Sequence, residues 1–568
     1  MNTHGKWRTR NLVGLAIAAA FGTAGGVANA AVDCASLKGL TLANTTVLEA
    51  ETRPAGANVI TGTFSTVNGA ELGHFSGNIP VPVCRVRVSI KPTSVSNVIS
   101  EYWLPLSGWN GRYEVVGRGG TAGSLGLSDL ATAVGLGYAA ATSDTGHQSN
   151  DSSFALVRLN GVPELVEDFA HRGYHVTTDT GKQVIQAFYG TGPQYSYFTG
   201  CSTGGGEALS ELQRYPNDFD GIVGGAPASG YSLMWPGEVF PSWVASTYTT
   251  AASGGPTGLQ SKMAALNNAA LNACATSTNG AGQRYIDDPR TCTFDPGAIQ
   301  CPTGTNTTSC LTPDQVTAVR KIYAGFKDPT TGAQIWEPYM RGSEDQWGGH
   351  IIQGNSAAGN PPVNYSRYFM YQDPTWFYTN PTTLLGDNGH GFNMEGASTL
   401  NEIYANDVFW APYLDSIDPN LRPFQTRGSK VILYHGWKDQ NIAPLHTVEY
   451  YESVVARVAG YHSDFPPAIT QQSPLYKAAL KKTQMFARLF MVPGMQHCNG
   501  GPGPNTFDAL GAMVQWVEHG VAPDSIVATH STSGAVDSSR PLCPYPQVAR
   551  WSGVGSVNDA ANYACQNP

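Results

Sequence analysis

The pentapeptide Gly200-Cys201-Ser202-Thr203-Gly204 constrains the fold of this chain more than any other feature. It has the form G-x-S-x-G, in which a serine occupies a tight turn between a strand and a helix. An aromatic strand candidate at 195–199 precedes the turn, and an apolar pattern at 206–215 predicts a helix after it. A glycine-rich turn with an incidental serine is the alternative, and the strand–turn–helix context favours a nucleophile elbow.

A serine hydroxyl becomes a nucleophile only beside a general base, and that base needs an orienting acid. In α/β-hydrolases the acid and then the histidine follow the serine in the chain, each after a strand. A buried strand is predicted just before Asp439, and another just before His497. We therefore predict Ser202 as nucleophile, His497 as base and Asp439 as acid. His435 and His446 are alternative bases, but both lie close in sequence to the expected acid.

The N-terminus has the form of a signal peptide. Basic residues precede an apolar, alanine-rich run at 12–27, and Ala28-Asn29-Ala30 is a small-x-small cleavage site. The run is short for a membrane anchor. We expect cleavage near Ala30 and a secreted or periplasmic protein.

All ten cysteines follow the expected cleavage site, and an even count in an exported protein indicates disulfides. Cys201 precedes the predicted nucleophile and Cys498 follows the predicted base, so we predict a bridge between them. It would close a loop of roughly 300 residues and restrict the unfolded chain by about 5 kcal/mol. Spacing alone does not determine the other pairings. Local pairing suggests Cys274–Cys292, Cys301–Cys310 and Cys543–Cys565.

The length of 568 residues exceeds the size at which one hydrophobic core usually stops growing. Short apolar runs alternate with helical patterns at 31–227 and again at 422–568, as in parallel βαβ units. Between 228 and 421 this alternation is lost, and four cysteines occur among many Asn, Thr, Gly and Pro residues. We interpret 228–421 as a lid domain inserted into a catalytic core. Within the core, alternation at 85–90 predicts a half-exposed strand.

Charge and hydropathy exclude some classes of partner. The net charge is −9, and there is no basic run beyond the first residues, which argues against nucleic acid. After the N-terminal run, no stretch is apolar and long enough to cross a bilayer.

Several motifs resemble those of the tannase and feruloyl esterase family, from about Cys34 to the C-terminus. They are Trp109-Asn110-Gly111-Arg112, Ser143-Asp144-Thr145-Gly146-His147, the serine pentapeptide with Gly205, Tyr434-His435-Gly436, Pro493-Gly494-Met495-Gln496-His497-Cys498 and Leu542-Cys543-Pro544-Tyr545-Pro546. The resemblance implies an α/β-hydrolase fold with a lid, the triad and bridge predicted above, and pairing of Cys34 with Cys84. It also implies an oxyanion hole made of the backbone N–H groups of Gly120 and Thr203.

The resemblance further implies a secreted serine carboxylesterase that cleaves esters of aromatic acids through an acyl-enzyme. Feruloyl and galloyl esters are the first expectation for this small-molecule substrate. Terephthalate half-esters, which another family member cleaves, are the alternative. A secreted binding protein that has lost catalysis is the alternative of another class. The oligomeric state is left open.

The chain departs from the family pattern at a metal site. Family members usually carry a calcium loop after the first lid cysteine, but residues 274–282 contain no carboxylate, and the next ones are Asp287 and Asp288. Calcium prefers several anionic oxygens. We therefore expect no metal and no cofactor.

A second departure concerns the substrate. The terephthalate half-ester hydrolase of this family holds the free carboxylate with a lid arginine, but the corresponding stretch 360–366 has none, and Arg367 does not align with it. Aromatic lid residues are candidates for the wall of the acyl pocket, although each could equally belong to the lid core. They are Trp336, Trp347, Tyr365 and Trp376.

Overall fold

The computed structural model describes residues 32–60, 66–67, 70–71, 75–148, 153–155, 164–248, 258–348, 364–373, 393–461 and 471–568. The predicted signal peptide, Trp376 and residues 360–363 lie outside these ranges.

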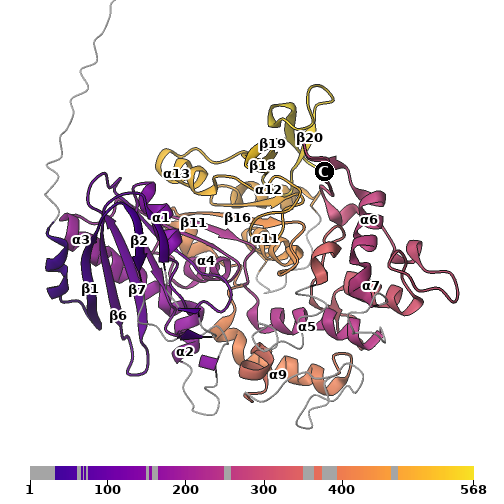
Figure 1. Cartoon of the computed structure of the whole chain (residues 1–568), viewed down its shortest axis with the longest axis horizontal. Coiled ribbons are helices and arrows are strands. Elements are labelled where there is room, and N and C mark those ends of the chain that lie inside the picture. The colour runs from indigo at the N-terminus through magenta and orange to yellow at the C-terminus, as the bar shows by residue number, and fades with distance from the viewer. Residues whose placement is uncertain are drawn as a thin grey trace, which may run out of the picture.

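A nine-stranded mixed sheet forms the centre of the core (Figure 1). Its strands, in spatial order, are β1 (Thr45–Arg53), β6 (Val83–Ile90), β7 (Val98–Pro105), β9 (Ala139–Ser143), β8 (Arg112–Val116), β10 (Tyr195–Cys201), β11 (Gly221–Gly225), β16 (Lys430–Gly436) and β17 (Ala487–Val492). The strands from β9 to β17 are all parallel, and antiparallel pairs extend the sheet from β9 to β1. The carboxyl ends of β10, β16 and β17 therefore lie at one edge of the sheet.

Helices cover both faces of this sheet. On one face lie α3 (Gly173–Tyr189), α4 (Thr203–Arg214) and α11 (Pro444–Val458), and on the other α1 (Leu127–Gly135) and α13 (Ala509–His519). Because side chains alternate across a strand, Val431 and Leu433 pack with the first group, whereas Ile432 packs with the second. Burial on both sides explains why these strands are apolar runs without polar alternation.

The strand predicted at 85–90 is present as part of β6, but the prediction that its arginine face is exposed is wrong. Arg85 and Arg87 are buried. The Arg85 guanidinium donates to Glu101, with Nε at 2.6 Å from Oε1, and to Glu49, with Nη1 at 2.6 Å from Oε2. These carboxylates come from the neighbouring strands and compensate the positive charge of Arg85. The guanidinium can therefore be buried without hydration by water.

Residues 228–421, the predicted lid, add no strand to the large sheet among the positions described. They contain α5 (Tyr231–Tyr248), α6 (Met263–Cys274), α7 (Pro313–Ala324), α9 (Ala397–Leu414) and the small hairpins β12 (Ser277–Thr278) with β13 (Arg284–Tyr285) and β14 (Phe326–Lys327) with β15 (Gln334–Trp336). An aromatic-rich cluster of buried side chains packs these helices together. In Figure 1, α6 and α7 lie at the end of the molecule opposite β1 and β6.

Other α-helices and strands lie outside the large sheet. They are α2 (Glu164–Glu167), α10 (Arg422–Arg427), α12 (Pro474–Thr483), and the hairpins β2 (Gly56–Ile60) with β5 (Phe75–Ile79), β3 (Thr66–Val67) with β4 (Ala70–Glu71), β18 (Ile526–Thr532) with β19 (Ala535–Leu542), and β20 (Val548–Trp551) with β21 (Tyr563–Gln566). Within the described ranges, no helix is both long enough and apolar enough to cross a membrane.

All ten cysteines form disulfides. The pairs are Cys34–Cys84, Cys201–Cys498, Cys274–Cys292, Cys301–Cys310 and Cys543–Cys565. Four of them close loops of between 9 and 50 residues, whereas Cys201–Cys498 spans 297. The long-range bridge therefore joins the segments that precede and follow residues 228–421, the predicted lid.

Candidate active site

Ser202 occupies the turn between β10 and α4 in a strained backbone conformation, with φ 65° and ψ −126°. A non-glycine residue rarely adopts positive φ, so the surrounding backbone must hold it there. The Ser202 N–H donates to the Gly225 carbonyl (3.0 Å), and the Ala228 N–H donates to the Ser202 carbonyl (3.0 Å). A Cβ on Gly200 would collide with the Gly204 carbonyl oxygen, which explains the first glycine of the motif.

Asp439 and His497 lie in the turns that follow the neighbouring parallel strands β16 and β17. The two turns pack directly on each other, since the Lys438 N–H donates to the Met495 carbonyl (2.9 Å). A side chain on Gly436 would strike the same carbonyl. Backbone contacts thus bring the predicted acid and base together.

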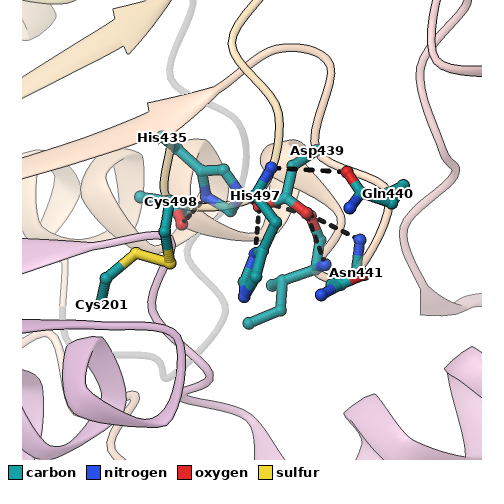
Figure 2. The surroundings of a disulfide bond; sticks show 9 residues. Cys201, His435, Asp439, Gln440, Asn441, His497 and Cys498 are labelled. Atoms are coloured by element: carbon teal, nitrogen blue, oxygen red, sulfur yellow. Dashed lines mark hydrogen bonds and ion pairs between the residues drawn. A yellow bond between two sulfur atoms is a disulfide. The ribbon is translucent and has the colours of Figure 1, made fainter. Parts of the chain in front are cut away.

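His497 and Asp439 form a hydrogen-bonded ion pair, with 2.8 Å between Nδ1 and Oδ2 (Figure 2). Nδ1 must carry the proton because it faces a carboxylate, which leaves Nε2 as the proton acceptor. Burial lowers the pKa of His497, but the Asp439 charge and hydrogen bond outweigh it and raise this pKa above the usual value. Burial also opposes ionisation of Asp439, yet its two histidine neighbours hold its pKa well below the usual range.

His435, the first alternative base, also contacts Asp439. It is fully buried, and its Nε2 is 3.0 Å from Asp439 Oδ2. His446, the second alternative, contacts Ser229 (3.0 Å) and Glu337 (3.5 Å) instead. Ser202 and His497 line one cavity, whereas neither alternative base is among the described residues that line it.

The Cys201–Cys498 bridge ties the Ser202 turn to the His497 turn, with 5.9 Å between the Cα atoms (Figure 2). Among the described residues, no hydrogen bond joins the Ser202 hydroxyl to His497. Such bonds are often long without substrate and tighten in the reacting complex. The bridge limits how far the two residues can separate.

Gly120 and Thr203, predicted to form the oxyanion hole, line the same cavity as Ser202. Thr203 begins α4, where the N–H groups have no partner within the helix. The Thr203 hydroxyl donates to the Gly120 carbonyl, which joins the two segments. In the described part of the chain, neither backbone N–H donates a hydrogen bond, so both are available to an anionic oxygen.

Glu207 supports this loop from within α4, a contact that no sequence pattern indicated. The Arg118 N–H, two residues before Gly120, donates to Glu207 Oε2 at 3.0 Å. The carboxyl is buried, and burial raises its pKa well above the usual value.

The cavity has a volume of about 590 Å³, within the range of small-molecule sites. The core contributes Ser202, His497 and the glycine-rich loop, and the lid helix α5 contributes Met234, Trp235 and Glu238. These lid residues were not among the predicted site residues. The spacing of Met234 and Glu238, one helical turn, was the signal available, because it places both on one helix face.

Three of the four aromatic residues predicted for the acyl pocket lie away from the cavity, and Trp376 is outside the described residues. Trp347 and Tyr365 are buried in the lid core, where Trp347 Nε1 donates to Ser343 and the Tyr365 hydroxyl donates to the Ser232 carbonyl. Trp336 is buried against His446. None of the three is among the residues that line the cavity, so the structure supports the lid-core alternative for them.

The region of the family's calcium loop does not fit a cation. Asp287 pairs with Arg540 and accepts hydrogen bonds from Thr276 and Ser277, and Asp288 pairs with Arg290 at 2.7 Å. Over the ranges that the structure covers, no three His, Cys, Asp or Glu side chains are grouped as metal ligands. The carboxylates that calcium would need are already neutralised by arginines.

The family model "Tannase and feruloyl esterase" matches residues 84–566. An uncharacterized esterase of Xanthomonas campestris is 35% identical over 96% of this chain and 93% of its own length. The mono(2-hydroxyethyl) terephthalate hydrolase of Piscinibacter sakaiensis is 33% identical over 81% of this chain and 80% of its own.

Among solved structures, feruloyl esterase B from Aspergillus oryzae superposes with a TM-score of 0.77. The match covers 94% of this chain and 99% of that one, at 27% identity. The predicted α/β-hydrolase fold is confirmed.

Proposed function

Since this chain belongs to the tannase and feruloyl esterase family and is a carboxylic ester hydrolase, we propose that it cleaves esters of aromatic acids with Ser202 as nucleophile. The observation that carries the proposal is one cavity that contains Ser202, a histidine hydrogen-bonded to a buried carboxylate, and two free backbone N–H groups among the described residues. This set of groups suffices for acyl transfer.

In the proposed reaction, Ser202 Oγ attacks the ester carbonyl while His497 Nε2 accepts the hydroxyl proton. Asp439 stabilises the resulting imidazolium, and the oxyanion accepts hydrogen bonds from the Gly120 and Thr203 N–H groups. The tetrahedral intermediate collapses when His497 protonates the leaving alcohol. Water then attacks the acyl-enzyme by the same steps, and the acid is released.

The walls of the cavity support an uncharged aromatic acyl group. Trp235 offers an aromatic surface from the lid. Glu238 places a carboxyl group in the same wall, which favours a phenolic hydroxyl as a hydrogen-bond partner. Feruloyl and galloyl groups carry both features.

Terephthalate half-esters are the second candidate, because one relative is named for that activity. Their free carboxylate requires a cationic partner. Arg118 lines the cavity, but its Nη1 is 3.1 Å from Asp129 Oδ2, so its charge is already partly compensated. Glu238 lines the same cavity, and its carboxyl group offers no favourable contact to the carboxylate of the substrate. We therefore rank these half-esters below the phenolic esters.

We also infer that the enzyme works outside the cytoplasm. Five disulfides support this location, because stable disulfides form in oxidising compartments.

The test compares the purified protein on methyl ferulate, methyl gallate and mono(2-hydroxyethyl) terephthalate, with the released acids separated by chromatography. We expect the highest kcat/KM on a phenolic ester. In Glu238→Gln, the terephthalate half-ester should gain relative to methyl ferulate, since the amide can donate a hydrogen bond to the carboxylate of the substrate. A fluorophosphonate should label the enzyme at Ser202, which separates catalysis from the binding-protein alternative. Absence of label in an active preparation would contradict the mechanism.

A further inference from the structure

The carboxylate of Asp439 receives four hydrogen bonds, and two of them come from imidazoles. The N–H groups of Asn441 (2.7 Å) and Ile442 (3.0 Å) donate to Oδ1. His497 Nδ1 (2.8 Å) and His435 Nε2 (3.0 Å) both contact Oδ2 (Figure 2). The oxygen that serves the predicted base is therefore shared with a second histidine.

The surroundings of His435 determine which of its nitrogens carries the proton. Nε2 faces two acceptors, Asp439 Oδ2 and the Ile442 carbonyl at 3.2 Å, so Nε2 must be the donor. Nδ1 lies 2.7 Å from the hydroxyl of Thr447 in α11. In the neutral ring this hydroxyl donates to Nδ1. The side chains of Thr447, His435 and Asp439 are fully buried, so water does not replace these hydrogen bonds.

A chain of oriented donors thus runs from Thr447 through His435 to Asp439. When one carboxylate oxygen accepts hydrogen bonds from two N–H groups, its negative charge is shared between them. Each donor is then attracted less strongly than a single donor would be. The shared oxygen therefore stabilises a protonated His497 less than an unshared oxygen would. A base that releases its proton more readily stays neutral, and so competent, at lower pH.

We infer that His435, held by Thr447, is a positioning residue that tunes the proton affinity of His497 through Asp439. The inference rests on the proposed function, because it assigns His497 as the base. It goes beyond the triad because it assigns to His435 an influence on the lowest pH at which the enzyme stays active.

Other titratable groups lie near this network and could also act on His497. Glu238 faces it from α5 across the cavity, and the Tyr339 hydroxyl donates to the Asn441 carbonyl at 3.2 Å. Lys438 is paired with Asp345 at 2.8 Å. Arg118 and Asp129, which form an ion pair, also line the cavity. The variants below leave all of these residues unchanged.

The experiment measures kcat/KM against pH on methyl ferulate, whose ester is uncharged. His435→Leu removes the donor to Asp439, and His435→Gln retains an N–H that can reach it. At low pH, kcat/KM falls as His497 becomes protonated, and we call this part of the profile the acidic limb. In His435→Leu, we expect the acidic limb to move to higher pH by roughly half a unit or more. His435→Gln should remain closer to the parent protein, because its amide replaces the lost bond.

Thr447 provides an independent pair of variants away from the cavity. Thr447→Val removes the hydroxyl that orients His435, and Thr447→Ser keeps it. Thr447→Val should shift the limb in the same direction by a smaller amount, while Thr447→Ser should not. If His435→Leu fails to fold, this pair decides the question. His446→Gln, on the same helix but without contact to Asp439, is the matched control and should keep the parent profile.

Melting temperatures separate this role from a structural one. A folded His435→Leu protein with reduced stability but an unmoved acidic limb would overturn the inference. Equal shifts in His435→Leu and His435→Gln would do the same, since only one of them lacks the donor. Failure of the triad would look different: Ser202→Ala would stay active, or the fluorophosphonate would label another residue, whatever the limb does.

Discussion

The core and the lid both line the cavity, but they hold their residues there by different means. In the core, backbone hydrogen bonds between turns position Ser202, Asp439 and His497 at the carboxyl ends of β10, β16 and β17. In the lid, α5 presents Met234 and Trp235 as side chains on a helix surface. Several backbone contacts thus fix the position of each proposed catalytic group. The lid surface of the cavity depends instead on individual side chains.

The disulfides differ in the same way. The lid bridges Cys274–Cys292 and Cys301–Cys310 close short loops of 18 and 9 residues. The core bridge Cys201–Cys498 spans 297 residues and adjoins two predicted catalytic residues. We therefore predict that changes in the core alter the rate on every ester, whereas changes in the lid alter the choice of substrate.

The largest expected effect comes from the core. Ser202→Ala and His497→Ala should each lower kcat on every ester by about 10³-fold or more, because the two residues act as a unit. Asp439→Asn should lower it by less. Steady-state kinetics on methyl ferulate and on a small nitrophenyl ester measure these losses. Near-full activity of Ser202→Ala would exclude the serine mechanism.

The second prediction compares the two kinds of disulfide. Replacing both Cys201 and Cys498 by Ala should lower kcat by roughly tenfold to a hundredfold, since proton transfer depends on the Ser202–His497 distance. The control replaces Cys301 and Cys310 by Ala. It should cost about 2 to 3 kcal/mol of unfolding free energy and leave kcat nearly unchanged. Similar losses of kcat in both variants would remove the special role of the core bridge.

The third prediction concerns the lid wall. Trp235→Ala should change the ratio of kcat/KM between methyl ferulate and a small nitrophenyl ester by roughly tenfold, because only the larger acyl group reaches this wall. Trp347→Phe, which changes the lid core, should leave that ratio unchanged. A uniform loss on both substrates would mean that Trp235 supports the fold and does not select the acyl group.

The smallest expected effect is that of a chelator. Because Asp287 and Asp288 are paired with arginines, EDTA should shift the melting temperature by no more than about 2 °C and leave activity unchanged. Differential scanning fluorimetry with and without added calcium measures this. A large destabilisation by EDTA that calcium reverses would establish a metal site.

The boundaries of α4 illustrate the limit of local patterns. The sequence predicts a helix at 206–215, but α4 begins at Thr203, directly after the nucleophile. Glycines at 204–206 have low helix propensity, which hides the first turn from a sequence-based prediction. They are required because a Cβ on Gly205 would collide with the Gly225 carbonyl, and one on Gly206 with that of Ala228.

The sequence by itself determined the α/β-hydrolase class and the candidates Ser202, Asp439 and His497. Each candidate follows a strand within a few residues, so its signal is local, and parallel strands bring such turns to one sheet edge. Only the tertiary structure decided the burial of Arg85, the second histidine on Asp439 and the lid residues at the cavity. These features depend on contacts between segments that are far apart in the chain. The spacing of residues along the sequence does not predict which distant side chains come into contact.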